Sequence, residues 1–257
     1  MTLELERPRA AEDLYLARAE EVDAFRPVIQ GDVFRNVAIP GVELKHDGVM
    51  LVEHPCSMRK GAKLKARLQA IPVIKYQRVS LEHWPTKHLR VFPLPGLDRN
   101  TPDTHLAASF DEIGMINSSE LSLGSRVACL SESGILILQQ RRIFSQARTK
   151  VETSTLREHQ AHIFEEVELQ EDWNRELVSL RVLIGEELEL AIAAEAIEFD
   201  AYLQSSSEPG ANESLRERLL VEHHRASVRR QVRREVSRRA DDVRNTAQSG
   251  LVEDDKG

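Results

Sequence analysis

The 257-residue sequence has few cysteines, few aromatic residues and no long apolar run, and these shortages exclude several classes of protein. Two cysteines, Cys56 and Cys129, are too few and too far apart for a disulfide-built secreted fold. The most apolar windows, 135–138 and 190–196, are short or interrupted by charge, so no transmembrane helix is expected. Residues 1–13 are rich in Glu and Arg and lack the apolar core of a signal peptide. We therefore expect a soluble, cytoplasmic protein with no membrane partner.

The usual signatures of cofactors and metals are also missing. The sequence contains no GxGxxG, no phosphate-binding loop, no HExxH and no CxxC, so neither a cofactor nor a metal is expected. A zinc site drawn from His54, Cys56, His83 and His88 is a minor alternative, because these residues lack the paired spacing of zinc ligands. A net charge of -7 and a pI of about 5.8 indicate that the whole protein is not a general binder of nucleic acid.

What is present indicates two kinds of structure in succession. Between residues 28 and 130, short β-branched stretches alternate with Gly and Pro turns, which is typical of a small antiparallel barrel. After Leu130 the apolar spacing becomes helical, and Ser131 or Ser133 can cap a helix that ends near Arg148. We therefore predict an α+β protein, in which a small SH3-like antiparallel β-barrel is followed by a C-terminal helical region.

The composition predicts five segments along the chain. They are an N-terminal lead with a short helix (1–27), the barrel domain (28–150), an acidic helical region (151–204), an arginine-rich helix (213–244) and a disordered tail (245–257). A linker is expected over 205–212, which contains Pro209 and Gly210. Thr155 and Glu158 fit a capping box, and the basic residues 59–67 are expected in an exposed loop or short helix.

Two blocks of opposite charge lie on either side of the linker. Residues 155–203 contain 13 acidic residues and three arginines, whereas residues 213–240 contain nine arginines and four glutamates. The two blocks either pair within the chain or mediate self-association, or the basic helix binds a protein partner, or it binds nucleic acid. The basic helix lacks aromatic residues on which single-stranded bases could stack, which disfavours the last interpretation.

Reactive side chains gather where the apolar stretch 49–52 runs into a Pro-Cys turn. Cys56, Ser57 and Arg59 are the candidate catalytic residues, because a thiol or hydroxyl beside positive charge is a potential nucleophile. The candidate substrate-binding residues are His54, Lys60, Lys63 and Asp32. In the structural alternative, Cys56 is a small buried apolar residue, Ser57 is a turn residue and Asp32 holds a turn.

The strand start at Gly31 and Asp32, the strand over 48–54, the turn over 55–61 and the strand near 71–74 resemble the PemK/MazF-like group of SH3-like barrels. This resemblance implies RNA binding or cleavage, a neutralising protein partner and a tendency to dimerise. Where that family carries an Arg-Pro pair, this sequence has His46 and Asp47, and it has no clear Ser or Thr near Lys75. Ser57, Arg59 and Lys60 are therefore candidates on chemical grounds alone.

The sequence leaves several functional hypotheses open. The first is a barrel that binds or cuts RNA in a toxin–antitoxin or phage-defence system, which makes the protein a candidate endoribonuclease. The second is a non-catalytic adaptor that binds a protein partner, antitoxin-like or a defence-complex subunit, through its charged C-terminal helices, with a homodimer as a further option. The third is a cysteine-dependent enzyme built on Cys56.

Overall fold

The computed structural model describes residues 4–98, 104–206 and 213–254. The chain divides into two compact units. The N-terminal unit contains most of residues 1–160, and the C-terminal unit contains residues 161–257 together with the short segments 25–27 and 60–63. No helix in the described ranges is long and apolar enough to cross a membrane.

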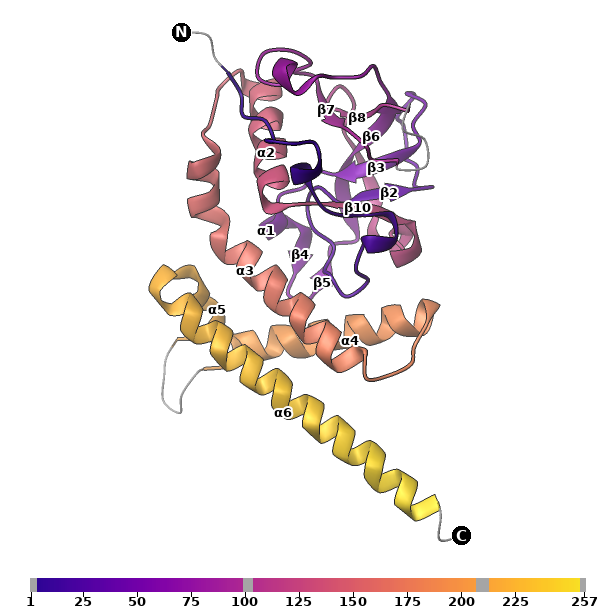
Figure 1. Cartoon of the computed structure of the whole chain (residues 1–257), viewed down its shortest axis with the longest axis vertical. Coiled ribbons are helices and arrows are strands. Elements are labelled where there is room, and N and C mark those ends of the chain that lie inside the picture. The colour runs from indigo at the N-terminus through magenta and orange to yellow at the C-terminus, as the bar shows by residue number, and fades with distance from the viewer. Residues whose placement is uncertain (1–3, 99–103, 207–212, 255–257) are drawn as a thin grey trace. The chain divides into compact units, whose positions relative to one another are not determined.

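The N-terminal unit is built on one antiparallel sheet that curls into a half-barrel (Figure 1). The strand order is β1-β10-β2-β3-β6-β8-β7, and β9 also pairs with β6. The strands are β1 (Tyr15–Arg18), β2 (Val33–Arg35), β3 (Gly48–Leu51), β6 (Arg67–Lys75), β7 (Val91–Leu94), β8 (Leu106–Ser109), β9 (Gly114–Asn117) and β10 (Arg126–Leu130). Short 3-10 turns punctuate the unit at η1 (Glu12–Leu14), η2 (Ala19–Glu21), η3 (Leu81–His83), η4 (Ser118–Glu120) and η5 (Leu123–Ser125). The predicted α+β class and the order of barrel before helices are confirmed.

The strand β6 organises this sheet because it is long enough to hold three neighbours. One of its edges pairs with β3 over its middle, from Ala70 to Val73. Its other edge pairs with β9 over the first half and with β8 over the second half. Apolar side chains of these strands form a core cluster that consists of Phe34, Val37, Ile39, Val49, Leu51, Met58, Leu68, Ala70 and Ile116. Burial of these side chains is the main favourable term for this unit.

The helix α2 (Glu132–Ala147) is capped by Ser131, one of the two serines that the sequence offered, and the Ser131 hydroxyl accepts a hydrogen bond from the Gly134 N–H at 3.1 Å. A Cβ on Gly134 would lie 2.2 Å from the Leu14 carbonyl oxygen, so only glycine permits this close approach of the helix to η1. The guanidinium of Arg141 is buried and donates to the carbonyl oxygens of Trp84 and His88, each at 2.7 Å. Burial lowers the pKa of Arg141 to about 10.

A chain of buried amide side chains joins the sheet to helices of the same unit. Gln30 donates to the Val52 carbonyl oxygen at 2.8 Å and accepts from the Gln139 amide at 2.6 Å. Gln139 and Gln160 exchange two further hydrogen bonds at 2.8 and 2.7 Å. The network satisfies polar groups that would otherwise destabilise the core.

The C-terminal unit is helical. It contains α4 (Gly185–Gln204), α5 (Leu215–Leu220), α6 (Glu222–Asp254) and the part of α3 (Thr153–Val178) that follows residue 160. Trp173 lies in its core, where the ring packs edge-on against Phe199 with centroids 5.6 Å apart and the indole N–H donates to Glu195 at 3.2 Å. The rest of this core consists of Leu169, Leu177, Leu203, Leu215, Leu219, Val228, Val232, Val236 and Ala240.

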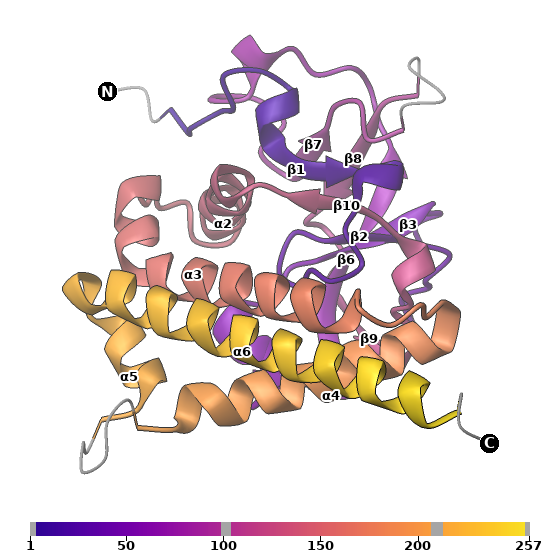
Figure 2. The same cartoon turned by 60° about the horizontal axis from the view of Figure 1, so that its bottom comes forward.

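The two charge blocks pair within this unit. Figure 2 shows α6 beside α3 and α4, and the ion pairs join α6 to both. Arg229 pairs with Glu165 at 2.5 Å and Arg239 pairs with Glu198 at 3.2 Å, while Arg216 of α5 pairs with Glu166 and Asp200 at 2.8 and 2.9 Å. The intramolecular interpretation of the charge blocks is therefore the one observed.

Several sequence expectations differ from the structure at the level of single elements. The helix expected in the N-terminal lead is replaced by β1, because this segment pairs with β10 and Ala19 adopts a left-handed φ of 53° that breaks a helix. The basic stretch 59–67 contains a two-stranded hairpin, β4 (Arg59–Lys60) with β5 (Lys63–Leu64), before β6 begins.

The observed helix boundaries also differ from those expected from the sequence. The capping box expected at Thr155 is not formed, because α3 already begins at Thr153, and Ser214 and Glu217 form a capping box at α5 instead. α6 continues from Glu222 to Asp254, where a disordered tail was expected from residue 245. Most of the predicted linker, residues 207–212, lies outside the described residues.

Candidate functional site

The turn that follows β3 brings two reactive side chains together. Pro55 begins the single-turn helix α1 (Pro55–Met58), and His54 caps it. The His54 Nδ1 lies 2.8 Å from the Cys56 Sγ and also accepts from the Cys56 backbone N–H at 3.4 Å. Cys56 is exposed and its sulfur lies 4.0 Å from the Ser57 Oγ. The predicted crowding of His54, Cys56 and Ser57 at this strand end is therefore present in the structure.

Arg142 contributes positive charge beside this turn, although it comes from α2, far away in sequence. It donates to the Gln69 Oε1 at 2.7 Å and to the carbonyl oxygen of Val52, which directly precedes the turn. Burial, and then the positive charge of Arg142, lower the pKa of His54 below its ordinary value of 6.5. At neutral pH the imidazole is therefore uncharged and can accept a proton.

This arrangement has the chemistry of a proton-transfer pair. The Nδ1 of a neutral imidazole can accept the proton of the Cys56 thiol, and a thiolate is the nucleophilic form of cysteine. The same imidazole can instead take a proton from a bound substrate, with the thiol as a neighbouring donor. The geometry supports both roles, and exposure of Cys56 leaves the pair open to solvent.

The other predicted catalytic residue, Arg59, binds a backbone carbonyl group of a neighbouring segment. Its guanidinium is half-buried and donates to the Val28 carbonyl oxygen at 3.1 Å. The exposed side chains of Lys60 and Lys63 lie on the β4–β5 hairpin, within the segment that groups with the C-terminal unit.

Asp32, a predicted substrate-binding residue, is fully buried. Its carboxylate accepts from the Ile29 N–H at 3.1 Å and pairs with Arg126, also buried, at 3.3 Å. Gly31 precedes it with a φ of 88°, a conformation that favours glycine. Asp32 thus holds the turn that leads into β2, which was the structural alternative, and a substrate cannot reach it in this conformation.

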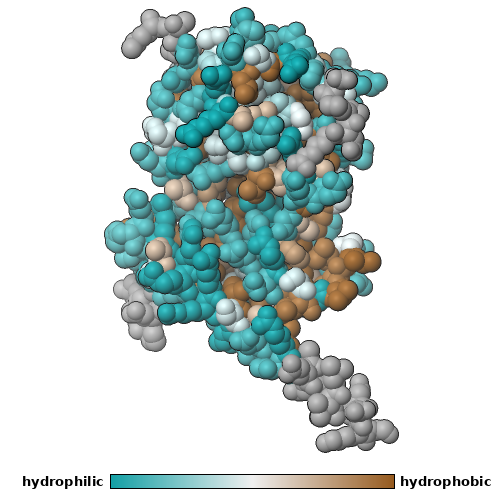
Figure 3. All heavy atoms as spheres, viewed as in Figure 1, coloured by the Kyte–Doolittle hydropathy of each residue, from teal (hydrophilic) through white to brown (hydrophobic). Residues whose placement is uncertain are grey.

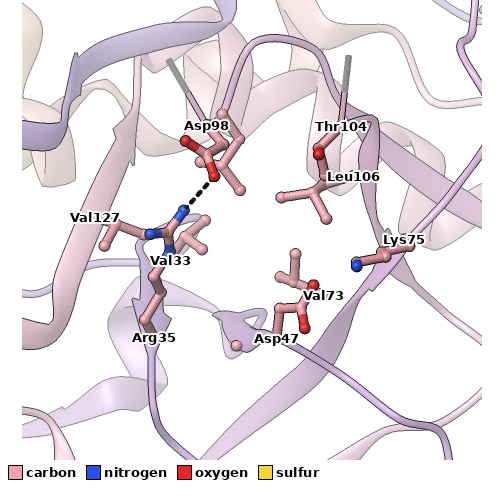
Figure 4. Close-up of a pocket in the computed structure, with 11 residues that line it drawn as sticks. Val33, Arg35, Asp47, Val73, Lys75, Asp98, Thr104, Leu106 and Val127 are labelled. Atoms are coloured by element: carbon pink, nitrogen blue, oxygen red, sulfur yellow. Dashed lines mark ion pairs between the residues drawn. The ribbon is translucent and has the colours of Figure 1, made fainter. Parts of the chain in front are cut away.

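A pocket with a volume of about 360 Å³ lies on the sheet itself, and sequence analysis did not predict it. Its lining comes from five strands, with Val33, Val73, Leu106 and Val127 among its apolar members (Figure 4). Arg35, Asp47, Lys75, Asp98 and Thr104 provide its polar groups. Asp98 and Thr104 flank residues 99–103, which lie outside the described residues.

The charges of this pocket are unevenly satisfied. Arg35 pairs with Asp98 at 3.1 Å, as the dashed line in Figure 4 shows. In the part of the chain that the structure describes, the side chains of Asp47 and Lys75 have no ion-pair or hydrogen-bond partner, and both are exposed. Figure 4 shows the carboxylate and the ammonium near one another on one side of the cavity. The pocket therefore offers an apolar floor with a free acceptor and a free donor at its rim.

The pocket and the His54 turn are two separate features at opposite ends of β3. Gly48, at one end of the strand, lines the pocket, whereas His54 follows the other end. At about 3.3 Å for each extended residue, the chain between them spans at most roughly 20 Å. An extended polymer such as a short single strand of RNA could contact both places.

Within the described ranges, no three His, Cys, Asp or Glu side chains are grouped as metal ligands are. The zinc alternative drawn from His54, Cys56, His83 and His88 thus has no ligand cluster to support it. No protein-family model matches the chain, and no curated protein matches it either.

Proposed function

We propose that the N-terminal unit binds unpaired RNA and that one base occupies the pocket at Asp47 and Lys75. The observation that carries this proposal is the combination of an apolar floor with a free carboxylate and a free ammonium at the rim. A cavity of about 360 Å³ is at the small end of ligand pockets, which suits a single heterocycle better than a large ligand. The setting that we propose remains a toxin–antitoxin or phage-defence system, as the barrel resemblance suggested.

An unpaired base has the complementary chemistry. Its two faces are apolar and can lie against Val33 and Val73, while the Arg35 guanidinium offers a planar group for stacking. Its edge carries N–H donors for the Asp47 carboxylate and carbonyl acceptors for the Lys75 ammonium. Bases in a duplex do not expose these faces, so we expect single-stranded RNA to bind better than double-stranded RNA.

We further propose that the His54 turn carries out the cleaving step when RNA reaches it. Neutral His54 takes the proton of a ribose 2′-hydroxyl, and the 2′-oxygen forms a bond to the adjacent phosphorus. The bond from phosphorus to the 5′-oxygen then breaks, and that oxygen receives a proton from the Cys56 thiol or from water. The products are a 2′,3′-cyclic phosphate and a 5′-hydroxyl. The 2.8 Å separation of the His54 Nδ1 and the Cys56 Sγ places a proton acceptor and a proton donor side by side.

Binding is tested by fluorescence anisotropy with labelled single-stranded RNA at low salt. Loss of Lys75 or Asp47 removes a charged hydrogen-bond partner, so Lys75→Ala and Asp47→Asn should each weaken binding about tenfold or more. Lys87→Ala removes an exposed lysine that does not line the pocket, and it should bind like the unchanged protein. Absence of binding to any single-stranded RNA would refute the proposal. Equal binding by all three variants would refute the placement of a base in the pocket at Asp47 and Lys75.

Cleavage is tested separately by incubating the protein with a mixture of RNAs and identifying the product ends by mass spectrometry. A positioned general base contributes about 10²–10⁴-fold, so His54→Gln should lower the rate by that factor while leaving RNA affinity unchanged. If RNA binds but is not cut, the protein is a binding module and the His54 step is wrong.

A further inference from the structure

The pocket on the sheet holds two opposite charges that the chain leaves without partners. Asp47 and Lys75 both line it, and in the described chain neither side chain makes an ion pair or hydrogen bond, with the other or with a third group. The second pair of charges in the lining, Arg35 and Asp98, is joined at 3.1 Å and lies across the cavity in Figure 4. A carboxylate only accepts hydrogen bonds and an ammonium only donates them, so one ligand that carries donors beside an acceptor can satisfy both.

The sheet fixes the backbone that carries both groups. Asp47 directly precedes β3, and its N–H donates to the Val73 carbonyl oxygen of β6 at 2.9 Å. Lys75 is the last residue of β6 and lies opposite Leu106 in the ladder with β8. The two side chains therefore start from neighbouring, hydrogen-bonded strand ends, and Figure 4 shows their charged groups near one another. Sites built on strands hold their groups more precisely than sites built on loops.

The Watson–Crick edges of the four bases match this arrangement unequally. Guanine presents two adjacent N–H donors, at N1 and at the N2 amino group, followed by the O6 acceptor. Uracil has one N–H between two carbonyl oxygens, whereas adenine and cytosine each have one amino group beside a ring nitrogen that accepts. A carboxylate can form two parallel hydrogen bonds with guanine alone, because on the other bases its second oxygen faces a lone pair.

An apolar surface without such charges cannot read a base edge. The C-terminal unit exposes Val182 and Ile184 before α4, and Figure 3 shows apolar residues in brown over this segment and the start of the helix. α4 itself has no Lys or Arg that could meet a carbonyl oxygen of a base. The pocket at Asp47 and Lys75 instead joins an apolar floor to both an acceptor and a donor.

We infer that the pocket selects guanine among the bases of unpaired RNA. The Asp47 carboxylate accepts from N1–H and the N2 amino group, and the Lys75 ammonium donates to O6. The rings lie on the apolar floor at Val33 and Val73. Adenine fits worst, because its amino group meets the Lys75 ammonium where guanine has O6. Guanine selection rests on the proposed RNA binding and adds which base enters the pocket.

Fluorescence anisotropy with short labelled oligouridines that differ only in their central base tests the selection. A bidentate contact discriminates against a wrong base by about ten- to a hundredfold, so guanine should bind that much more tightly than adenine, cytosine or uracil. Inosine lacks only the N2 amino group of guanosine, and an oligomer with central inosine should bind about tenfold more weakly than the guanine oligomer. Equal binding of these two oligomers would overturn the contact with Asp47.

Two variants assign the contacts to their residues. Asp47→Ala should abolish the difference between guanine and inosine, because the partner of the amino group is lost. Lys75→Ala should weaken both oligomers by the same factor, because both bases carry O6. Glu43→Ala is the matched control, since Glu43 is exposed in the same β2–β3 connection but does not line the pocket, and it should keep the full difference. Each result is a ratio of two affinities within one variant, so partial unfolding does not change it.

The outcomes separate guanine selection from RNA binding. If all oligomers bind equally, or if Asp47→Ala keeps the difference between guanine and inosine, RNA binding stands and guanine selection is overturned. If no oligomer binds, the RNA-binding proposal fails, and calorimetric titration with guanosine monophosphate decides the pocket. Heat of binding that disappears in Asp47→Ala would support guanine recognition, whereas no heat would overturn it as well.

Discussion

The Nδ1 of His54 lies 2.8 Å from the thiol sulfur of Cys56, in a turn where the imidazole is also the cap of a short helix. One side chain thus holds the backbone of the turn and faces its most reactive group. Because burial and Arg142 keep His54 uncharged at neutral pH, it can act as a proton acceptor there.

The first prediction concerns the reactivity of the two cysteines. Iodoacetamide should modify exposed Cys56 rapidly and leave Cys129 untouched, because Cys129 is buried. His54→Gln should slow the modification of Cys56 several-fold, since the thiol loses its proton acceptor. Intact-mass spectrometry over time measures both rates. Equal rates with and without His54 would show that the 2.8 Å contact has no chemical consequence.

The second prediction concerns pH. The pKa of His54 is lower in the folded protein than its value of 6.5 in the unfolded chain. As pH falls, His54 therefore becomes protonated in the unfolded state before it does so in the folded state. The folding stability that neutral His54 contributes is complete above pH 6.5 and is lost as pH falls through the folded pKa. Urea unfolding between pH 5 and 8 should show stability that decreases on acidification. In His54→Gln this decrease should be smaller, and an unchanged slope would contradict the assignment.

The third prediction concerns the buried ion pair of Asp32 and Arg126. Removing one partner leaves an uncompensated buried charge, so Asp32→Ala should lower the free energy of unfolding by about 3–5 kcal/mol. Arg90→Ala breaks an exposed pair with Asp111 and should cost at most about 1 kcal/mol. Urea denaturation compares the two variants. Similar small losses in both would mean that the turn at Asp32 does not depend on the pair.

The fourth prediction concerns what holds the helical unit together. The bond between Arg229 and Glu165 is short, but the arginine is 39% exposed, so a double-mutant cycle should give a coupling of at most about 1 kcal/mol. Phe199→Ala removes a buried ring beside Trp173 and should cost about 3–5 kcal/mol. Thermal unfolding followed by circular dichroism ranks the two. A coupling larger than the cost of Phe199→Ala would show that charge, rather than the apolar core, dominates.

Local patterns in the sequence were sufficient to predict the barrel strands, Ser131 as one of two candidate caps of α2, and the internal pairing of the charge blocks as one of three interpretations. They were insufficient for β1, because a strand there depends on pairing with β10, more than a hundred residues away. Tertiary pairing of this kind overrides local propensity.

The same limit explains which parts of the candidate site could be predicted from the sequence. The turn at His54 and Cys56 is local, so the sequence showed it. Arg142, which helps keep His54 neutral, comes from α2, far away in sequence, and no local pattern assigned it to the turn. The pocket at Asp47 and Lys75 is lined from five strands, and no local pattern could bring them together. Asp32 fitted two interpretations until its burial beside Arg126 separated them.

The amide chain from Gln160 through Gln139 and Gln30 to the Val52 carbonyl oxygen contains no ionisable group. Acidification that protonates His54 therefore leaves this attachment intact, while the two residues that follow Val52 lead directly into the titrating turn. His54 can thus gain or lose a proton while the amide chain that attaches Val52 to the helices keeps its hydrogen bonds. A pH-dependent activity could therefore arise at this turn without disrupting the sheet next to it.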